Sequence, residues 1–189
     1  TAYFFARYLT EHLKVPVGIL VSAWGGTPAE VWTPADIVEN DEILSKNKLK
    51  EYPWWPIKPG VLYNQMIHPL VPYQIAGCIW YQGESNQENA PSYARLVSKM
   101  VEAWRKDFGW DFPFYYVQIA PHTYGAKNNT PALLREQQEL MLGQVKNTAM
   151  INISDLVENV KDIHPRNKRA IGERLACLAM DKVYGQFTG

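Results

Sequence analysis

Cysteine is scarce in this chain of 189 residues, and neither sign of charge is in excess. The two cysteines, Cys78 and Cys177, lie in apolar stretches. Unpaired buried thiols are common, so we expect neither a disulfide framework nor a zinc-ligand spacing. Lysine plus arginine and aspartate plus glutamate both number 19, which disfavours nucleic acid and anionic membranes as partners. No apolar run approaches the roughly 18 residues of a membrane span, and no signal peptide is visible.

A hydrophobic content of 47% is ample for a packed core, and the length predicts one domain, residues 1–189. The first residues form an amphipathic helical pattern, with Phe5, Leu9 and Leu13 on one stripe. No upstream residues provide a start for this helix. We therefore expect the sequence to begin inside a larger, N-terminally incomplete domain.

Apolar strand patterns alternate with amphipathic helical patterns along the chain. Strands are expected at residues 15–24, 75–80, 114–120 and 149–153. Helices are expected over residues 1–13, after Thr33, over residues 63–68, 92–108 and 130–145, and from Pro165. Residues 40–60, rich in Trp and Pro, are expected to form a long irregular insertion. This order predicts an α/β fold, a three-layer sandwich around a parallel sheet.

Polar or glycine-rich sequence follows each expected strand. The groups are Gly25-Gly26, Gly83 to Asn86, Pro121-His122 and Ser154-Asp155, and a fifth group, Asp162 to Pro165, precedes the last helix. Ligands of open α/β sheets bind at the carboxyl ends of the strands. We therefore expect these groups to meet at one edge of the sheet.

His164 is the residue around which a reaction can be built. An imidazole oriented by a nearby carboxylate, such as Asp162, can act as a general base. Glycine amides and a side-chain amide at the same edge could stabilise an oxyanion, which is the arrangement required for ester hydrolysis. From the residues alone a second interpretation stays open, in which Asp162 caps the last helix and His164 is solvated. The polar residues after Trp80 could likewise only cap the next helix.

Four segments, in order, resemble the sialate O-acetylesterase and acetylxylan esterase branch of the SGNH (GDSL-like) hydrolase superfamily. They are S-A-W-G-G-T at residues 22–27, L-Y-N-Q-M-I-H-P-L at 62–70, W-Y-Q-G-E-S-N at 80–86 and D-I-H-P-R-N-K at 162–168. The resemblance covers nearly the whole chain. It implies a flavodoxin-like three-layer fold and removal of acetyl groups from an acetylated carbohydrate, without metal or cofactor.

The resemblance also implies roles for individual residues. His164 matches the catalytic base, while Gly25 (or Gly26) and Asn86 match the oxyanion donors. Asp162 is the first choice for the acid that orients His164, and Glu84 is the second. Gln82 is also expected to contact substrate. Independently of the resemblance, Trp54 and Trp55 in the insertion are candidates for a wall that faces a sugar, although packing is the commoner role for such tryptophans.

The chain departs from the family pattern at two places. Nothing matches the first block, which resembles G-Q-S-N and carries the nucleophilic serine on a central strand, so we expect that serine upstream of Thr1. The position three residues before His164, where the superfamily has its acid, is Lys161. Ser85 is the alternative nucleophile, although G-E-S-N lacks the second glycine of a nucleophile elbow.

The resulting hypothesis is a carbohydrate O-acetylesterase acting through a serine and His164. The alternatives are a catalytically inactive carbohydrate-binding or scaffold domain, and an esterase for lipid or aryl esters. Bacterial members of the family are often exported, which implies a secreted or periplasmic location.

Overall fold

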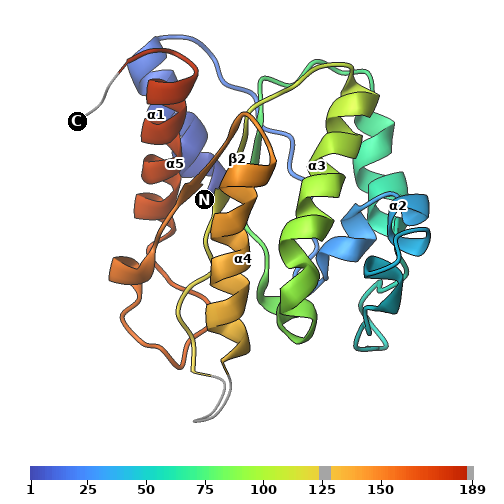
Figure 1. Ribbon diagram of the computed structural model, residues 1–189. Helices are drawn as coiled ribbons and strands as arrows, with labels where there is room; N and C mark the ends of the chain where they lie inside the picture. The colour runs from blue at the N-terminus through green and yellow to red at the C-terminus, as the bar shows by residue number, and fades with distance from the viewer. Residues whose placement is uncertain (124–128, 187–189) are drawn as a thin grey trace.

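The computed structural model describes residues 1–123 and 129–186. Its described residues form one sheet of three parallel strands, β1 (Cys78–Trp80), β2 (Phe114–Val117) and β3 (Thr148–Ile151), in the order β1-β2-β3. Register pairs Trp80 with Tyr116 and Tyr116 with Met150. Helices lie on both sides of this sheet (Figure 1). The predicted α/β fold with a parallel sheet is confirmed.

Two pairs of helices cover the two faces of the sheet. On one face, α1 (Ala2–Leu13) packs against α5 (Lys168–Lys182), and on the other α3 (Tyr93–Phe108) packs against α4 (Thr130–Gln144). Phe114 and Tyr116 of β2 belong to the buried cluster under α3 and α4, whereas Tyr115 and Val117 belong to the cluster under α1 and α5. This alternation follows from the two-residue period of a strand.

Short helical segments connect these elements. They are α2 (Ala35–Glu39), the 3-10 helices η1 (Ala29–Trp32), η2 (Leu44–Lys46), η4 (His68–Leu70), η5 (Glu84–Ser92) and η6 (Ser154–Leu156), and the π-helix η3 (Tyr63–Ile67). Thr33 does not cap α2, because its hydroxyl donates to the carbonyl of Ala29 instead. Pro165 does not begin α5, because the side chain of Asn167 caps that helix by accepting the amide of Ala170 at 3.1 Å.

The predicted strand over residues 15–24 is wrong. These residues have no regular secondary structure, and the side chains of Leu20 and Val21 are 54% and 73% exposed. A strand needs a neighbour to pair its backbone groups. No strand of the described chain borders this segment, and the described sheet therefore has three strands rather than four.

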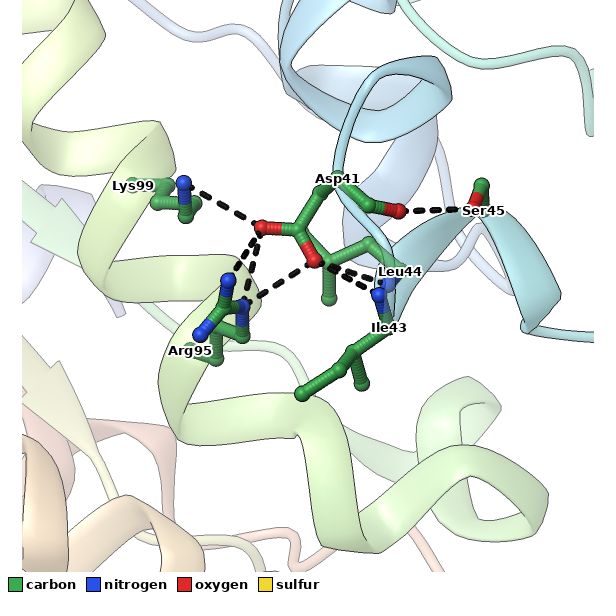
Figure 2. Close-up of polar contacts among 6 residues, drawn as sticks. All are labelled: Asp41, Ile43, Leu44, Ser45, Arg95 and Lys99. Carbon is green, nitrogen blue, oxygen red and sulfur yellow. Dashed lines mark hydrogen bonds and ion pairs between the residues drawn. The ribbon is translucent and has the colours of Figure 1, made fainter.

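The insertion at residues 40–60 contains η2 but no other helix or strand, and Asp41 anchors it to α3 (Figure 2). The Asp41 carboxylate accepts the amides of Ile43 and Leu44 at 2.9 and 3.0 Å and pairs with Arg95 and Lys99 of α3. Desolvation would raise the pKa of Asp41, but these hydrogen bonds and cations outweigh it and lower the pKa. The start of the insertion is therefore held firmly on the body of the fold.

Candidate functional site

A cavity of about 1540 Å³ separates residues 15–28 from the segment that contains β1. The edge of β1 that faces this cavity has no strand partner among the described residues. Helices α1 and α5 contribute one wall of the cavity, and residues of the α3 side contribute the other. Its apolar lining includes Phe5, Leu9, Ile79, Trp80, Trp104 and Leu175.

The Gly25-Gly26 turn lies at the mouth of the cavity. Gly26 has φ +80°, a conformation that side chains disfavour, and a Cβ there would lie 2.3 Å from Cζ2 of Trp55. The hydroxyl of Ser85 holds the turn by donating to the Gly26 carbonyl at 2.9 Å. The backbone amides of Gly25 and Gly26 donate to no group of the described chain. Both amides are thus free to stabilise an oxyanion.

Gln82 joins this turn to the residues that follow β1. Its Nε2 donates to the carbonyl of Thr27 at 3.2 Å and to Oδ1 of Asn86 at 2.7 Å, and its Oε1 accepts the Tyr93 hydroxyl at 3.0 Å. Gln82 lines the cavity, and its contact with substrate stays a prediction. Its amide is nevertheless engaged with protein groups.

Asn86 lies behind the cavity rather than in it. The side chain is 1% exposed and is absent from the cavity lining. Its Oδ1 accepts the backbone amide of Ala29 at 2.9 Å, and its Nδ2 donates to Oε2 of Glu30 at 2.7 Å. This orientation does not support the expected role of Asn86 as an oxyanion donor.

His164 lines the cavity from the loop before α5, and its side chain is exposed. The carboxylate of Asp162 accepts the backbone amide of His164 at 2.9 Å and lies 3.8 Å from Arg166. Asp162 therefore shapes the loop rather than capping α5, since the cap is Asn167. No described side chain makes a hydrogen bond to the imidazole of His164.

Glu84, like His164, lines the cavity. Desolvation raises the pKa of Glu84, and the charges of His164, Lys168 and His122 act in the opposite direction. Lys168 lies with its Nζ 4.8 Å from the centre of the Tyr81 ring. Desolvation lowers the pKa of Lys168 against the opposing charges of Glu84 and Asp162. The cavity therefore holds the Glu84 carboxylate together with the Lys168 amine and the His164 imidazole.

An aromatic group from the insertion borders the glycine turn. Trp55 lies in the cavity lining, and its ring centre is 4.4 Å from that of Tyr52 and 6.4 Å from that of Trp54. Trp54 is 65% exposed and is not part of the lining. The amine of Lys50 lies 5.1 Å from the centre of the Tyr52 ring. The group offers flat apolar faces beside the Gly25-Gly26 turn.

Only part of the predicted edge comes together at the cavity. Gly25-Gly26, three residues after β1 (Gln82, Glu84 and Ser85) and His164 all line it, whereas His122 and Asp155 do not. Asp155 is instead paired with Arg174. Glu30 was not predictable as a site residue, because it stands in an apolar stretch that shows no functional pattern, and Lys168 has no sequence signal apart from its place in the D-I-H-P-R-N-K segment.

Within the described chain, no helix is long and apolar enough to cross a membrane. The family model "Carbohydrate esterase, sialic acid-specific acetylesterase" matches residues 1–181. Human sialate O-acetylesterase is 30% identical over 97% of this chain and 39% of its own length. The mouse protein of the same name is 29% identical over 97% of this chain and 42% of its own. The chain thus spans about two fifths of the length of these relatives.

Two solved structures are similar in fold. A carbohydrate acetylesterase from Xanthomonas citri superposes with a TM-score of 0.83 at 40% identity, covering 97% of this chain and 41% of that one. An Arabidopsis thaliana protein superposes with a TM-score of 0.68, covering 94% of this chain and 66% of that one. At 19% identity the second shows the fold alone.

Proposed function

The chain belongs to the sialic acid-specific acetylesterase family of carbohydrate esterases, and from this premise we propose that its protein removes acetyl groups from an acetylated carbohydrate. The observation that carries the proposal is the mouth of the cavity. The same cavity is lined by the free amides of residues 25 and 26, the exposed imidazole of residue 164 and the carboxylate of residue 84, which are far apart in the sequence. These are the groups that acyl transfer needs around a nucleophile.

The proposed reaction has two steps. A serine hydroxyl attacks the acetyl carbonyl while His164 takes its proton, and the amides of Gly25 and Gly26 hold the oxyanion. Collapse of this intermediate releases the sugar hydroxyl, which receives the proton from His164. Water, deprotonated by His164, then attacks the acetyl-enzyme, and acetate leaves as the serine is regenerated.

We assign the orientation of His164 to Glu84 rather than to Asp162. The carboxylate of Asp162 is engaged by the backbone amide of His164 and lies near Arg166. Glu84 lines the same cavity as the imidazole, and the charge of His164 acts on it. An ionised Glu84 stabilises the imidazolium that forms when the serine loses its proton.

The nucleophile is proposed to come from a serine outside residues 1–189, on a strand that occupies the cavity. Within the described chain, the hydroxyls of Ser22 and Ser85 donate to the carbonyls of Met66 and Gly26. The cavity, at about 1540 Å³, exceeds the roughly 300–1,000 Å³ of ordinary ligand pockets. A strand there would pair with the free edge of β1 and end beside Gly25-Gly26 and His164.

Acetate release tests this function. The assay compares the 189-residue chain with a longer natural polypeptide that contains it, on acetylated sugars and on a simple acetyl ester. We expect activity only in the longer chain, and its loss on His164→Ala. Activity of the 189-residue chain itself would move the nucleophile inside it, with Ser85 as the first residue to replace. Sugar binding without turnover in the longer chain would refute the esterase in favour of a binding domain.

Trp54 and Trp55 are proposed to form the wall that contacts sugar rings. The Trp55 ring lies beside the glycine turn at which the acetyl group would react, and the centre of the Trp54 ring is 6.4 Å from that of Trp55. Trp54→Ala should raise KM for an acetylated oligosaccharide while leaving hydrolysis of p-nitrophenyl acetate unchanged. Equal losses on both esters would show that Trp54 only supports the fold. Faster turnover of long-chain lipid esters than of acetylated sugars would refute the carbohydrate substrate.

We also propose that the protein is exported to reach glycans outside the cytoplasm, because bacterial members of the family are often exported. Cell fractionation measures it directly. Recovery of the full-length protein in the cytoplasmic fraction alone would contradict export.

A further inference from the structure

Glu30 is a fully buried carboxylate that the proposed reaction does not use. Its side chain is 0% exposed, and no cation pairs with it among the described residues. Its two oxygens accept only side-chain amides, Oε2 from Asn86 at 2.7 Å and Oε1 from Asn47 at 2.9 Å. Burial of a carboxylate costs several kcal/mol unless hydrogen bonds compensate it. Such a group calls for a role that a neutral side chain of the same size would not fill.

The Glu30 carboxylate dictates which way the amide of Asn86 faces. A carboxylate only accepts, so the NH₂ group of Asn86 must lie against it. The amide oxygen of Asn86 then faces two donors, the backbone amide of Ala29 and Nε2 of Gln82. A reversed amide would place NH₂ against both donors and leave them unsatisfied. Asn86 thus has a single favourable orientation.

Through Asn86, this carboxylate fixes the position of the Gly25-Gly26 turn relative to the turn from Gln82 to Ser85. Ala29 follows the Gly25-Gly26 turn by three residues, and Gln82 begins the turn that carries Glu84. The hydrogen bond from Ser85 to Gly26 and that from Gln82 to Thr27 join the same two turns closer to the cavity. Misplacement of a catalytic group by about 1 Å can cost roughly 100-fold in rate.

We propose that Glu30 is a positioning residue of the esterase site, which acts through Asn86 to place the Gly25-Gly26 amides against the turn from Gln82 to Ser85. The proposal rests on the proposed function. It gives Asn86 a different role from the oxyanion donor expected from the sequence. The proposal also requires that the two turns are positioned by the pairing of one donor with one carboxylate at positions 30 and 86, and not by either side chain alone.

The positioning role is tested by exchanging the carboxylate and the amide between positions 30 and 86. Asn86→Asp places a second carboxylate against Glu30, and two adjacent carboxylates must share a proton. Glu30→Gln combined with Asn86→Asp restores the pair in reverse. The new amide at position 30 donates to the new carboxylate, its oxygen still accepts from Asn47, and position 86 still accepts from Ala29 and Gln82. The double variant keeps one buried carboxylate and every hydrogen bond.

The variants are made in the longer natural polypeptide, and kcat and kcat/KM on a simple acetyl ester are measured across pH. Asn86→Asp should lose about tenfold or more in kcat, with the loss growing as pH rises and removes the shared proton. The double variant should return to within about threefold of the parent and regain its pH profile. Asn40→Asp, at an exposed position on α2's C-terminal end, is the control for an added negative charge.

Two further measurements separate the possible failures. Thermal unfolding of each variant shows whether only stability changes, and an unchanged kcat of the folded fraction of Asn86→Asp would overturn the positioning role. Hydrogen exchange of the Ala29 amide needs no activity. It should be faster in Asn86→Asp at high pH and return to the parent rate in the double variant, even if the parent hydrolyses no ester. A double variant no better than Asn86→Asp in both assays would refute the proposal.

Discussion

Replacement of Gly26 by Ala tests whether the glycine turn is the oxyanion site. Two features of the structure make Gly26→Ala unfavourable. Gly26 has φ +80°, and an added Cβ would lie 2.3 and 2.4 Å from two atoms of the Trp55 ring. Left-handed backbone costs a residue with a Cβ about 1–2 kcal/mol. A contact of 2.3 Å cannot persist, so either the indole or the turn must move.

Gly109 provides the matched control, because it isolates the backbone strain. It has φ +77°, and nothing lies within 4 Å of the position its Cβ would take. Gly109→Ala should therefore cost about 1–2 kcal/mol in stability and leave esterase activity unchanged. Gly26→Ala should cost at least as much stability. If the turn moves, kcat should fall by about 10²–10³, the usual effect of losing one oxyanion donor.

The assay is kcat on a simple acetyl ester in the longer polypeptide, with urea unfolding of each variant. Trp55→Ala removes the ring that an added Cβ would meet. Gly26→Ala should therefore lose less kcat in the Trp55→Ala background than in the parent. If Gly26→Ala keeps kcat within about threefold of the parent, a range far below the loss of a donor, the turn is not the oxyanion site.

Four further variants test the charges and the packing of the fold. Glu84→Gln should raise the free energy of unfolding at neutral pH and leave it unchanged in acid. Desolvation raises the pKa of Glu84, so the parent loses stability as pH rises through that raised pKa, and the variant does not. Urea titrations at two pH values measure this difference. Asp41→Asn should cost about 1.5–3 kcal/mol, a difference that shrinks as pH falls below the unfolded pKa, because the folded pKa of Asp41 is lowered. Gly172→Ala should cost about 1–3 kcal/mol, since its Cβ would lie 2.6 Å from the carbonyl oxygen of Thr1. Gly143→Ala, with nothing within 4 Å, should gain up to about 1 kcal/mol by the same measurement.

The fold class was readable from the sequence because helix and strand periods alternate along it. The strand over residues 15–24 was not, because apolar character predicts burial but cannot supply a pairing partner. Its exposed residues instead border the cavity. The start of α5 was misplaced at Pro165, because the cap depends on the side chain of Asn167 reaching the Ala170 amide.

The sequence predicted which residues lie near the site better than it predicted which groups their side chains contact. Glycines 25 and 26 and His164 do line one cavity, although residues 15–24 form no strand that ends at Gly25. Asn86 was placed correctly after β1, but no pattern in the sequence shows that Glu30 lies against its amide. Glu30 and Asn86 are 56 residues apart, and such a contact follows only from the packing of η1 against η5.

The central position of β2 has a consequence for how the molecule opens. All four of its residues are buried, and it is hydrogen-bonded to a strand on each side, whereas β1 has one neighbour in the described sheet. Local opening requires the least free energy where backbone groups have fewest partners. Amides of β2 should therefore exchange only on global unfolding, while β1 and the turns beside it open far more often. In the 189-residue chain the edge of β1 beside the cavity would then open readily, and the strand that we propose to pair with this edge would suppress that opening.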